Sequence, residues 1–297
     1  MPALRACAAA TDCRLVVTQP DRPAGRGHRL QPTPVKRAAL DLGIATFEPL
    51  RLREAVDALR ACAADIFALA SYGKIVPQTV LDLPRLGALN VHPSLLPLYR
   101  GATPLQAQLR DGVRRGGVTI MLMDAGLDTG DIVLQSPSPI GPDETYGELH
   151  DRFAALGARM LGEVLALAAS GPLPRTPQAS FGIKAERIDA TATRPLDKAA
   201  LELDWNWSAQ RIVDHVRSLA PSPGARAELA GERVKLVRAT ISSTAHRSAP
   251  PGTLLGASGA GAAVACGDGA VLIERLVPPN RGETDGAAFA RAKAVAP

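Results

Sequence analysis

Three polar side chains near the middle of the chain have the types needed for acyl transfer: Asn90, His92 and Asp128. An Asn amide donates to a developing oxyanion, a His exchanges a proton near neutral pH, and a carboxylate orients that His or accepts a proton from an attacking amine. Together they indicate acyl transfer without a covalent enzyme intermediate. Taken singly, each has a simpler interpretation, since a strand-end His is usually structural and a loop Asp usually forms a turn.

The apolar run that ends at His92 predicts a strand. Asn90 and His92 are two residues apart, so both side chains project from the same face at its C-terminal end. Pro93 ends the strand, and the segment from Ser94 to Gly101 is too short and irregular for a helix. We therefore expect a shaped loop that lines a ligand pocket.

A second apolar run, Val118 to Met123, predicts another strand. The polar loop after it carries three carboxylates, Asp124, Asp128 and Asp131, which need solvent or partners. We expect one of them to meet His92.

The spacing of these residues resembles the signature of the folate-dependent formyltransferase family. The chain reads N-x-H-x-S-L-L-P-x-Y-R-G from Asn90 and D-x-G-x-D-T-G-D from Asp124. The resemblance implies that Asn90, His92 and Asp128 take the catalytic positions. It implies 10-formyltetrahydrofolate as the formyl donor, without a metal ion. It also implies tetrahydrofolate contacts from Ser94, Leu95, Leu96 and Pro97.

The segment from Thr18 to Lys36 is basic and is interrupted by Pro and Gly. Such a mobile basic segment suits contact with phosphates, although a solvated surface loop has the same composition. It resembles the loop that approaches the tRNA acceptor end in family members acting on methionyl-tRNA. The resemblance implies tRNA contacts from Arg22, Arg26 and Arg29.

The composition is that of a globular protein, with 46% hydrophobic and 21% charged residues among 297. The net charge of +5 weakly favours an acidic partner, and the aromatic content of 3% argues against base stacking as the main mode of nucleic-acid recognition. The four cysteines lack metal-site or disulfide spacing, which fits a reducing cytoplasm. We expect neither a membrane span nor a secretory signal.

Short apolar runs alternate with helical patterns along the first half of the chain. This alternation predicts an α/β fold with a doubly wound, Rossmann-like parallel sheet, whose ligand site lies beyond the C-terminal strand ends. The runs are 15–17, 66–70, 88–91 and 118–123, and the helical patterns are 33–42 and 52–63. A capping box at Thr145 and Glu148 begins a further helix that ends near Gly171.

We expect a catalytic domain over residues 1–171, a linker over 172–200 and a second domain over 201–297. The linker is rich in Pro, Thr, Ser and Ala, and its segment 185–195 has no functional interpretation from sequence. The last part predicts a helix and several short strands, and the resemblance implies a small OB-like barrel that helps to hold tRNA. Trp205 and Trp207 could stack on nucleotides or pack within this domain.

Family members begin with a strand and a Gly-Thr-Pro loop, whereas this sequence starts within the helix that follows them. We therefore expect the central first strand to be absent, with free edges on its two neighbours. Without that strand, the activity of the chain is an open question.

The activity that the resemblance implies is formyl transfer to the amino group of initiator methionyl-tRNA, by a cytoplasmic monomer. Three alternatives stay open: formylation of another amine such as a sugar or glycinamide ribonucleotide, hydrolysis of formyltetrahydrofolate, and tRNA binding without catalysis.

Overall fold

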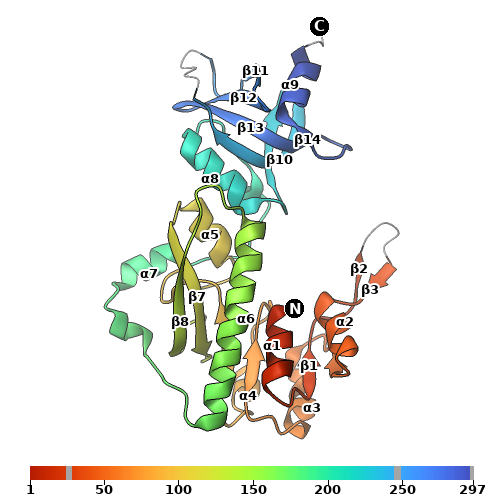
Figure 1. Ribbon diagram of the computed structural model, residues 1–297, viewed down its shortest axis with the longest axis vertical. Coiled ribbons are helices and arrows are strands. Elements are labelled where there is room, and N and C mark those ends of the chain that lie inside the picture. Colours follow the sequence, from red (N-terminus) through yellow and green to blue (C-terminus); the bar gives the residue numbers. More distant parts are fainter. Residues whose placement is uncertain (25–28, 244–248, 295–297) are drawn as a thin grey trace. The chain divides into compact units, whose positions relative to one another are not determined.

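The computed structural model describes residues 1–24, 29–243 and 249–294, which form two compact units (Figure 1). Unit 1 comprises 1–102, 116–138 and 152–193, and unit 2 comprises 103–115, 139–151 and 194–297. This division differs from the expected boundaries, because 103–115 and 139–151 group with the C-terminal part and 172–193 with unit 1.

The described part of unit 1 contains three sheets, of which one is the short pair β2 (Arg22–Ala24) and β3 (Arg29–Gln31). Strands β1 (Leu15–Val17) and β4 (Ala45–Phe47) form a parallel pair. The third sheet has the order β5 (Phe67–Leu69), β6 (Ala88–His92), β7 (Arg115–Leu122) and β8 (Ile132–Pro139). The predicted α/β class with parallel strands is confirmed, but this sheet is mixed because β7 runs antiparallel to β6.

The predicted helical patterns also appear in unit 1. Thr33 caps α2, since its hydroxyl accepts from Lys36 N at 3.1 Å. The expected linker is partly helical, as it contains η2 and α7. The bounds are α1 Pro2–Ala10, α2 Pro34–Asp41, η1 Leu52–Ala55, α3 Val56–Ala61, α4 Gln78–Leu81, α6 Tyr146–Ser170, η2 Gln178–Phe181 and α7 Ala185–Thr191.

Helix α6 begins at the predicted capping box, where Thr145 N donates to Glu148 Oε2 at 2.8 Å. It packs closely on the larger sheet, because a Cβ on Gly157 would lie 2.5 Å from Val91 Cγ1. By length and composition alone α6 could cross a membrane, although the sequence analysis expected no apolar stretch long enough to do so. Core helices of soluble proteins pass the same test, and Phe153 and Val164 on α6 are buried.

A cavity of about 420 Å³ is lined by both β1 and β5. In the described chain β1 pairs only with β4 and β5 only with β6, so each has a free edge. The lining of the cavity is largely apolar and includes Cys7, and burial raises the pKa of the Cys7 thiol to about 11.

Unit 2 is built on an antiparallel sheet of six strands, in the order β11-β12-β13-β10-β9 with β14 beside β13. The predicted short strands correspond to β9–β13 and the predicted helix to α8, whereas β14 and α9 were not predicted. The bounds are α5 Pro104–Arg110, η3 Ala199–Leu201, α8 Ala209–Leu219, β9 Ala225–Leu229, β10 Glu232–Ile241, β11 Leu254–Ser258, β12 Gly261–Cys266, β13 Gly269–Val277, β14 Thr284–Asp285 and α9 Gly286–Ala294.

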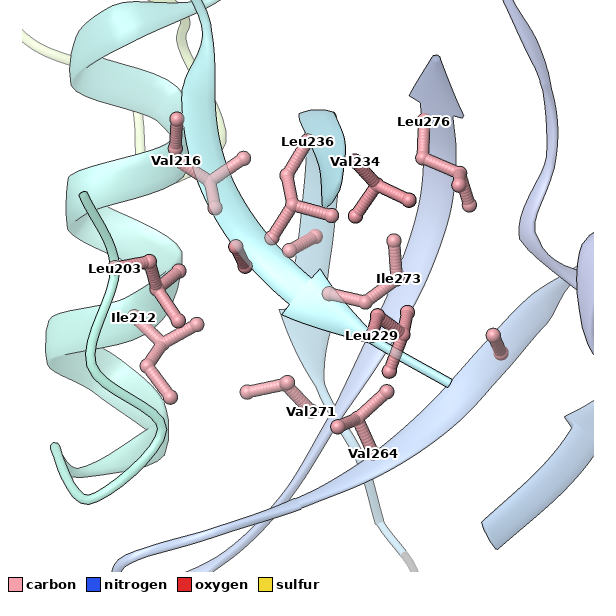
Figure 2. Close-up of a cluster of buried hydrophobic side chains, with 14 of the residues drawn as sticks. Leu203, Ile212, Val216, Leu229, Val234, Leu236, Val264, Val271, Ile273 and Leu276 are labelled. Atoms are coloured by element: carbon pink, nitrogen blue, oxygen red, sulfur yellow. The ribbon is translucent and has the colours of Figure 1, made fainter. Parts of the chain in front are cut away.

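The core of unit 2 lies between α8 and this sheet. Figure 2 shows Ile212 and Val216 of α8 facing strand residues such as Leu236 and Ile273, all of them buried. Trp205 packs against the same core, and its Nε1 donates to Glu228 O at 2.9 Å. This contact favours the packing interpretation of Trp205 over base stacking.

Candidate active site

The site begins at the C-terminal end of β6, where Asn90 is half-buried and His92 is only 3% exposed. Register with β7 places His92 opposite Thr119. Beyond Pro93 the chain turns at once, with Ser94 N donating to His92 O at 2.9 Å. The strand therefore fixes the backbone of both residues.

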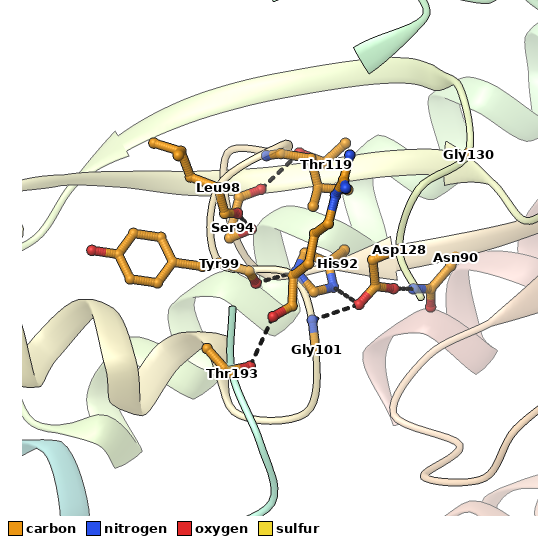
Figure 3. Close-up of polar contacts among 12 residues, drawn as sticks. Asn90, His92, Ser94, Leu98, Tyr99, Gly101, Thr119, Asp128, Gly130 and Thr193 are labelled. Carbon is orange, nitrogen blue, oxygen red and sulfur yellow. Dashed lines mark hydrogen bonds and ion pairs between the residues drawn. The ribbon is translucent and has the colours of Figure 1, made fainter. Parts of the chain in front are cut away.

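Asp128 meets both of them from the loop after β7 (Figure 3). Its Oδ1 accepts from Asn90 Nδ2 at 3.3 Å, and its Oδ2 lies 3.6 Å from His92 Nδ1. The backbone N–H of Gly101 donates to the same Oδ2 at 2.8 Å. The carboxylate expected to meet His92 is thus Asp128, whereas Asp124 bonds Gly126 N and Thr129 Oγ1 within its own turn.

Two residues at the site adopt the left-handed conformation without being glycine: Tyr99 with φ 59° and Asp128 with φ 54°. This conformation is costly for most side chains, although Asp tolerates it better than most. The surrounding bonds must hold both residues there.

His92 uses both ring nitrogens. Nε2 lies 2.9 Å from Tyr99 O, and because a carbonyl only accepts, Nε2 carries the hydrogen. Nδ1 then faces the Asp128 carboxylate. Burial lowers the pKa of His92, while Asp128 and the Tyr99 carbonyl act in the opposite direction. Burial therefore favours the neutral ring, with Nδ1 able to receive a proton beside a carboxylate.

Hydrogen bonds and close packing within unit 1 hold the loop after β6 in place. Ser94 Oγ donates to Leu98 O at 2.7 Å, and Gln135 Nε2 donates to Leu96 O at 3.0 Å. Leu95 is packed close to Gly117, where a Cβ would lie 2.5 Å from Leu95 Cδ2. Ser94, Leu96 and Pro97 are buried. A ligand contact from this loop would therefore come mainly from its backbone.

Two residues that the sequence analysis missed complete the site. Gln178 is 5% exposed and donates from Nε2 to Asp128 O and Gly130 O, each at 2.9 Å. Thr193 N and Oγ1 donate to Arg100 O at 2.8 and 3.0 Å. Both belong to the segment expected to be a linker, whose composition gave no signal of a role in the site.

The basic segment forms a short hairpin of β2 (Arg22–Ala24) and β3 (Arg29–Gln31), in which Arg22 pairs with Gln31. The hairpin stands apart from the other sheets of unit 1 (Figure 1). Arg22 is exposed, Arg29 lies on β3, and Arg26 falls outside the described residues. Lys36 is engaged elsewhere, with Asp21 at 3.0 Å and Glu48 at 3.3 Å.

Metal-ligating side chains do not gather in the described part of the chain, which has no group of three or more His, Cys, Asp or Glu residues placed to hold an ion. The four cysteines are unpaired with one another.

Comparison with solved structures shows the fold. A structure of HypX from Aquifex aeolicus in complex with tetrahydrofolic acid is 17% identical, with a TM-score of 0.66 over 96% of this chain and 48% of that one. An N-formyltransferase from Helicobacter canadensis, solved with folinic acid and dTDP-3-aminofucose, is 15% identical, with a TM-score of 0.60 over 86% of each chain.

Comparison of sequences gives relatives of higher identity. The formyl transferase model matches residues 2–165, and the model of the formyl transferase C-terminal domain matches 195–294. A methionyl-tRNA formyltransferase from Xanthomonas axonopodis pv. citri is 46% identical over 93% of this chain and 88% of its own length. One from Aromatoleum aromaticum is 44% identical over 92% and 84%. The chain therefore belongs to the formyl transferase family.

Proposed function

We propose that this chain transfers the formyl group of 10-formyltetrahydrofolate to the α-amino group of methionine on initiator tRNA. The observation that carries the proposal is the meeting of Asn90, His92 and Asp128 at the end of β6. Relatives named for this activity, at 44–46% identity over most of the chain, support the choice of substrate.

In the proposed reaction the neutral amine attacks the formyl carbon. A new C–N bond forms, the carbonyl oxygen becomes an oxyanion, and the bond from that carbon to N10 of the folate then breaks. Asn90 Nδ2 has two hydrogens, of which one bonds Asp128, so the other is available to the oxyanion.

The amine must lose a proton as it attacks, and N10 must gain one as it leaves. Asp128 takes the proton of the amine, and His92 Nδ1, 3.6 Å from Oδ2, shares it as an imidazolium beside the carboxylate. The same proton then passes to N10 as its bond to the formyl carbon breaks, which restores neutral His92 and ionised Asp128. Because both ring nitrogens of His92 already face partners, His92 acts on the oxyanion mainly through this positive charge.

The remaining assignments belong to the same proposal. The loop from Ser94 to Pro97 binds the folate through its backbone, and the exposed Arg22 with Arg26 and Arg29 contacts tRNA phosphates. Residues 1–171 act as a doubly wound catalytic domain, 172–200 connect it, and 201–297 form an OB-like barrel that holds tRNA. The chain works as a cytoplasmic monomer.

The test is transfer of labelled formyl from 10-formyltetrahydrofolate to methionyl-tRNA, with formate release measured alongside in the absence of an amine. Formyl-methionyl-tRNA is the expected product. Formate release alone would replace the proposal with hydrolysis, and salt-sensitive tRNA binding without turnover would replace it with a binding role.

Replacing Arg22, Arg26 and Arg29 together with Ala tests the tRNA assignment. We expect the KM for methionyl-tRNA to rise about tenfold or more at physiological salt while the KM for the folate stays within about twofold, because phosphate contacts contribute sequence-independent affinity. An unchanged KM for methionyl-tRNA would contradict this assignment.

A further inference from the structure

The chain that follows α6 comes back to the site and bonds both loops that form it. We call residues 176–193 the site strap. Thr176 exchanges two backbone hydrogen bonds with Ile132, both of 2.9 Å, which anchors the strap just after the Asp128 loop. At its other end, Tyr99 N donates to Thr191 Oγ1 at 3.1 Å, and Thr193 bonds Arg100 O.

Gln178 is the residue of the strap that reaches Asp128. Its Nε2 donates to Asp128 O and Gly130 O, each at 2.9 Å. Its Oε1 accepts from Arg100 Nε at 3.1 Å and Nη2 at 2.6 Å. One buried amide thus uses its full capacity to join the loop that carries Asp128 to the loop that carries Gly101.

These two loops must stay together for the site to keep its form. The Gly101 N–H on one loop bonds the carboxylate of Asp128 on the other. Asp128 also holds a left-handed backbone, with φ 54°, which its neighbours must stabilise. Since Gln178 bonds the carbonyl of this same residue, it restrains the backbone that directs the carboxylate toward Asn90 and His92.

We propose that Gln178 is a positioning residue that, through its bonds to Asp128, Gly130 and Arg100, holds the Asp128 carboxylate against Asn90 and His92. The expected effect of Gln178 on kcat rests on the proposed function, but the geometry that Gln178 maintains exists independently of any substrate. It also gives a role to part of the segment after α6, whose sequence indicates only a linker.

Two variants of the full chain separate the bonds involved. Gln178→Ala removes all of them, whereas Gln178→Glu keeps the acceptor for Arg100 but removes both donors. We expect each to lower kcat for methionyl-tRNA formylation about tenfold or more, with both KM values within about twofold, because small displacements of reacting groups are costly. Gln108→Ala is the matched control, since Gln108 is also a buried amide, 1% exposed, that donates to a backbone carbonyl, Pro104 O at 3.0 Å, but lies in unit 2 outside both site loops.

A double-mutant cycle with Asp128→Asn tests whether Gln178 acts through Asp128. In that background Gln178→Ala should change kcat less than about twofold, as expected for two residues that act as a unit. If the role of Gln178 were purely structural, the fold-losses of kcat in Gln178→Ala and in Asp128→Asn would multiply in the double variant.

A second readout needs no activity: the ¹⁵N signals of the His92 ring, identified by their loss in His92→Gln. Both Gln178 variants should move these signals in the direction seen in Asp128→Asn, while Gln108→Ala leaves them in place. Unmoved His92 signals in the Gln178 variants would overturn the inference whether or not the chain formylates methionyl-tRNA. Moved signals in a chain without such activity would support the positioning role and reject the proposed function.

Discussion

The site loops and the N-terminal part of unit 1 differ in how their buried polar atoms are bonded. Around Asp128, both carboxylate oxygens, the ring of His92 and the amide of Gln178 all have partners. In the part that carries β1, β4 and β5, three buried atoms have no hydrogen-bond partner among the described residues: Gln19 Oε1, Glu48 Oε1 and the Tyr72 hydroxyl.

This difference has an energetic meaning. A buried polar atom without a partner costs about 1–3 kcal/mol, and a cavity deprives its lining of packing contacts. The N-terminal region has both features, since Tyr72 also lines the cavity of about 420 Å³. We therefore expect substitutions in the site loops to affect chemistry first, and substitutions near the cavity to affect stability first.

The largest effect should come from Asn90→Ala. Loss of a hydrogen-bond donor to the oxyanion should lower kcat/KM about 10²- to 10³-fold. Formyl transfer kinetics measure this change, and the melting temperature should stay close to that of the original chain because Asn90 is only half-buried. A decrease smaller than about fivefold would remove Asn90 from the proposed role.

Gly101→Ala should have the next largest effect. Gly101 has φ +107°, and an added Cβ would lie 2.1 Å from Thr193 O, so the loop must move away from the strap. This movement displaces the N–H that bonds Asp128, and we expect kcat to fall about 10- to 100-fold. Enzyme kinetics and thermal unfolding measured on the same samples separate activity from stability.

Gly182→Ala is the matched control for this change. Gly182 also has a positive φ, +64°, but nothing lies within 4 Å of its added Cβ. It should reduce stability by about 1 kcal/mol through backbone strain and leave kcat within about twofold. Equal losses of kcat in the two variants would show that strain, rather than displacement of the N–H, explains the effect.

Tyr72→Phe should have the smallest effect and the opposite sign. It removes a buried hydroxyl without a partner, and we expect the free energy of unfolding to rise by about 0.5–1 kcal/mol. Chemical denaturation measures this gain, and kcat should be unchanged. A loss of stability would mean that the hydroxyl has a partner in solution, and the contrast between the two regions would weaken.

Much of this organisation could be predicted from local sequence. The apolar runs predicted four strands of unit 1 and placed Asn90 and His92 together at the end of one of them. Their meeting with Asp128 does not follow from strand pairing, because the antiparallel register sets the end of β7 beside the start of β6, so the loop after β7 must turn back to reach His92. Gln178 could not be predicted, because an amide in a Pro-rich segment carries no local sign of its distant partners. The separation of β1 from β5 depends on pairing between strands, which the periodicity of one strand does not encode.

The bonds of Gln178 also set an order for the assembly of the site during protein synthesis. Gln178 lies 78 residues after Arg100 and 50 residues after Asp128 in the chain. A nascent chain that has exposed only the first 170 residues already contains Asn90, His92 and Asp128 but lacks Gln178, which bonds both site loops. Completion of the site must therefore wait until the ribosome has released the strap, so any earlier fold of unit 1 would leave the Asp128 backbone without its bond from Gln178.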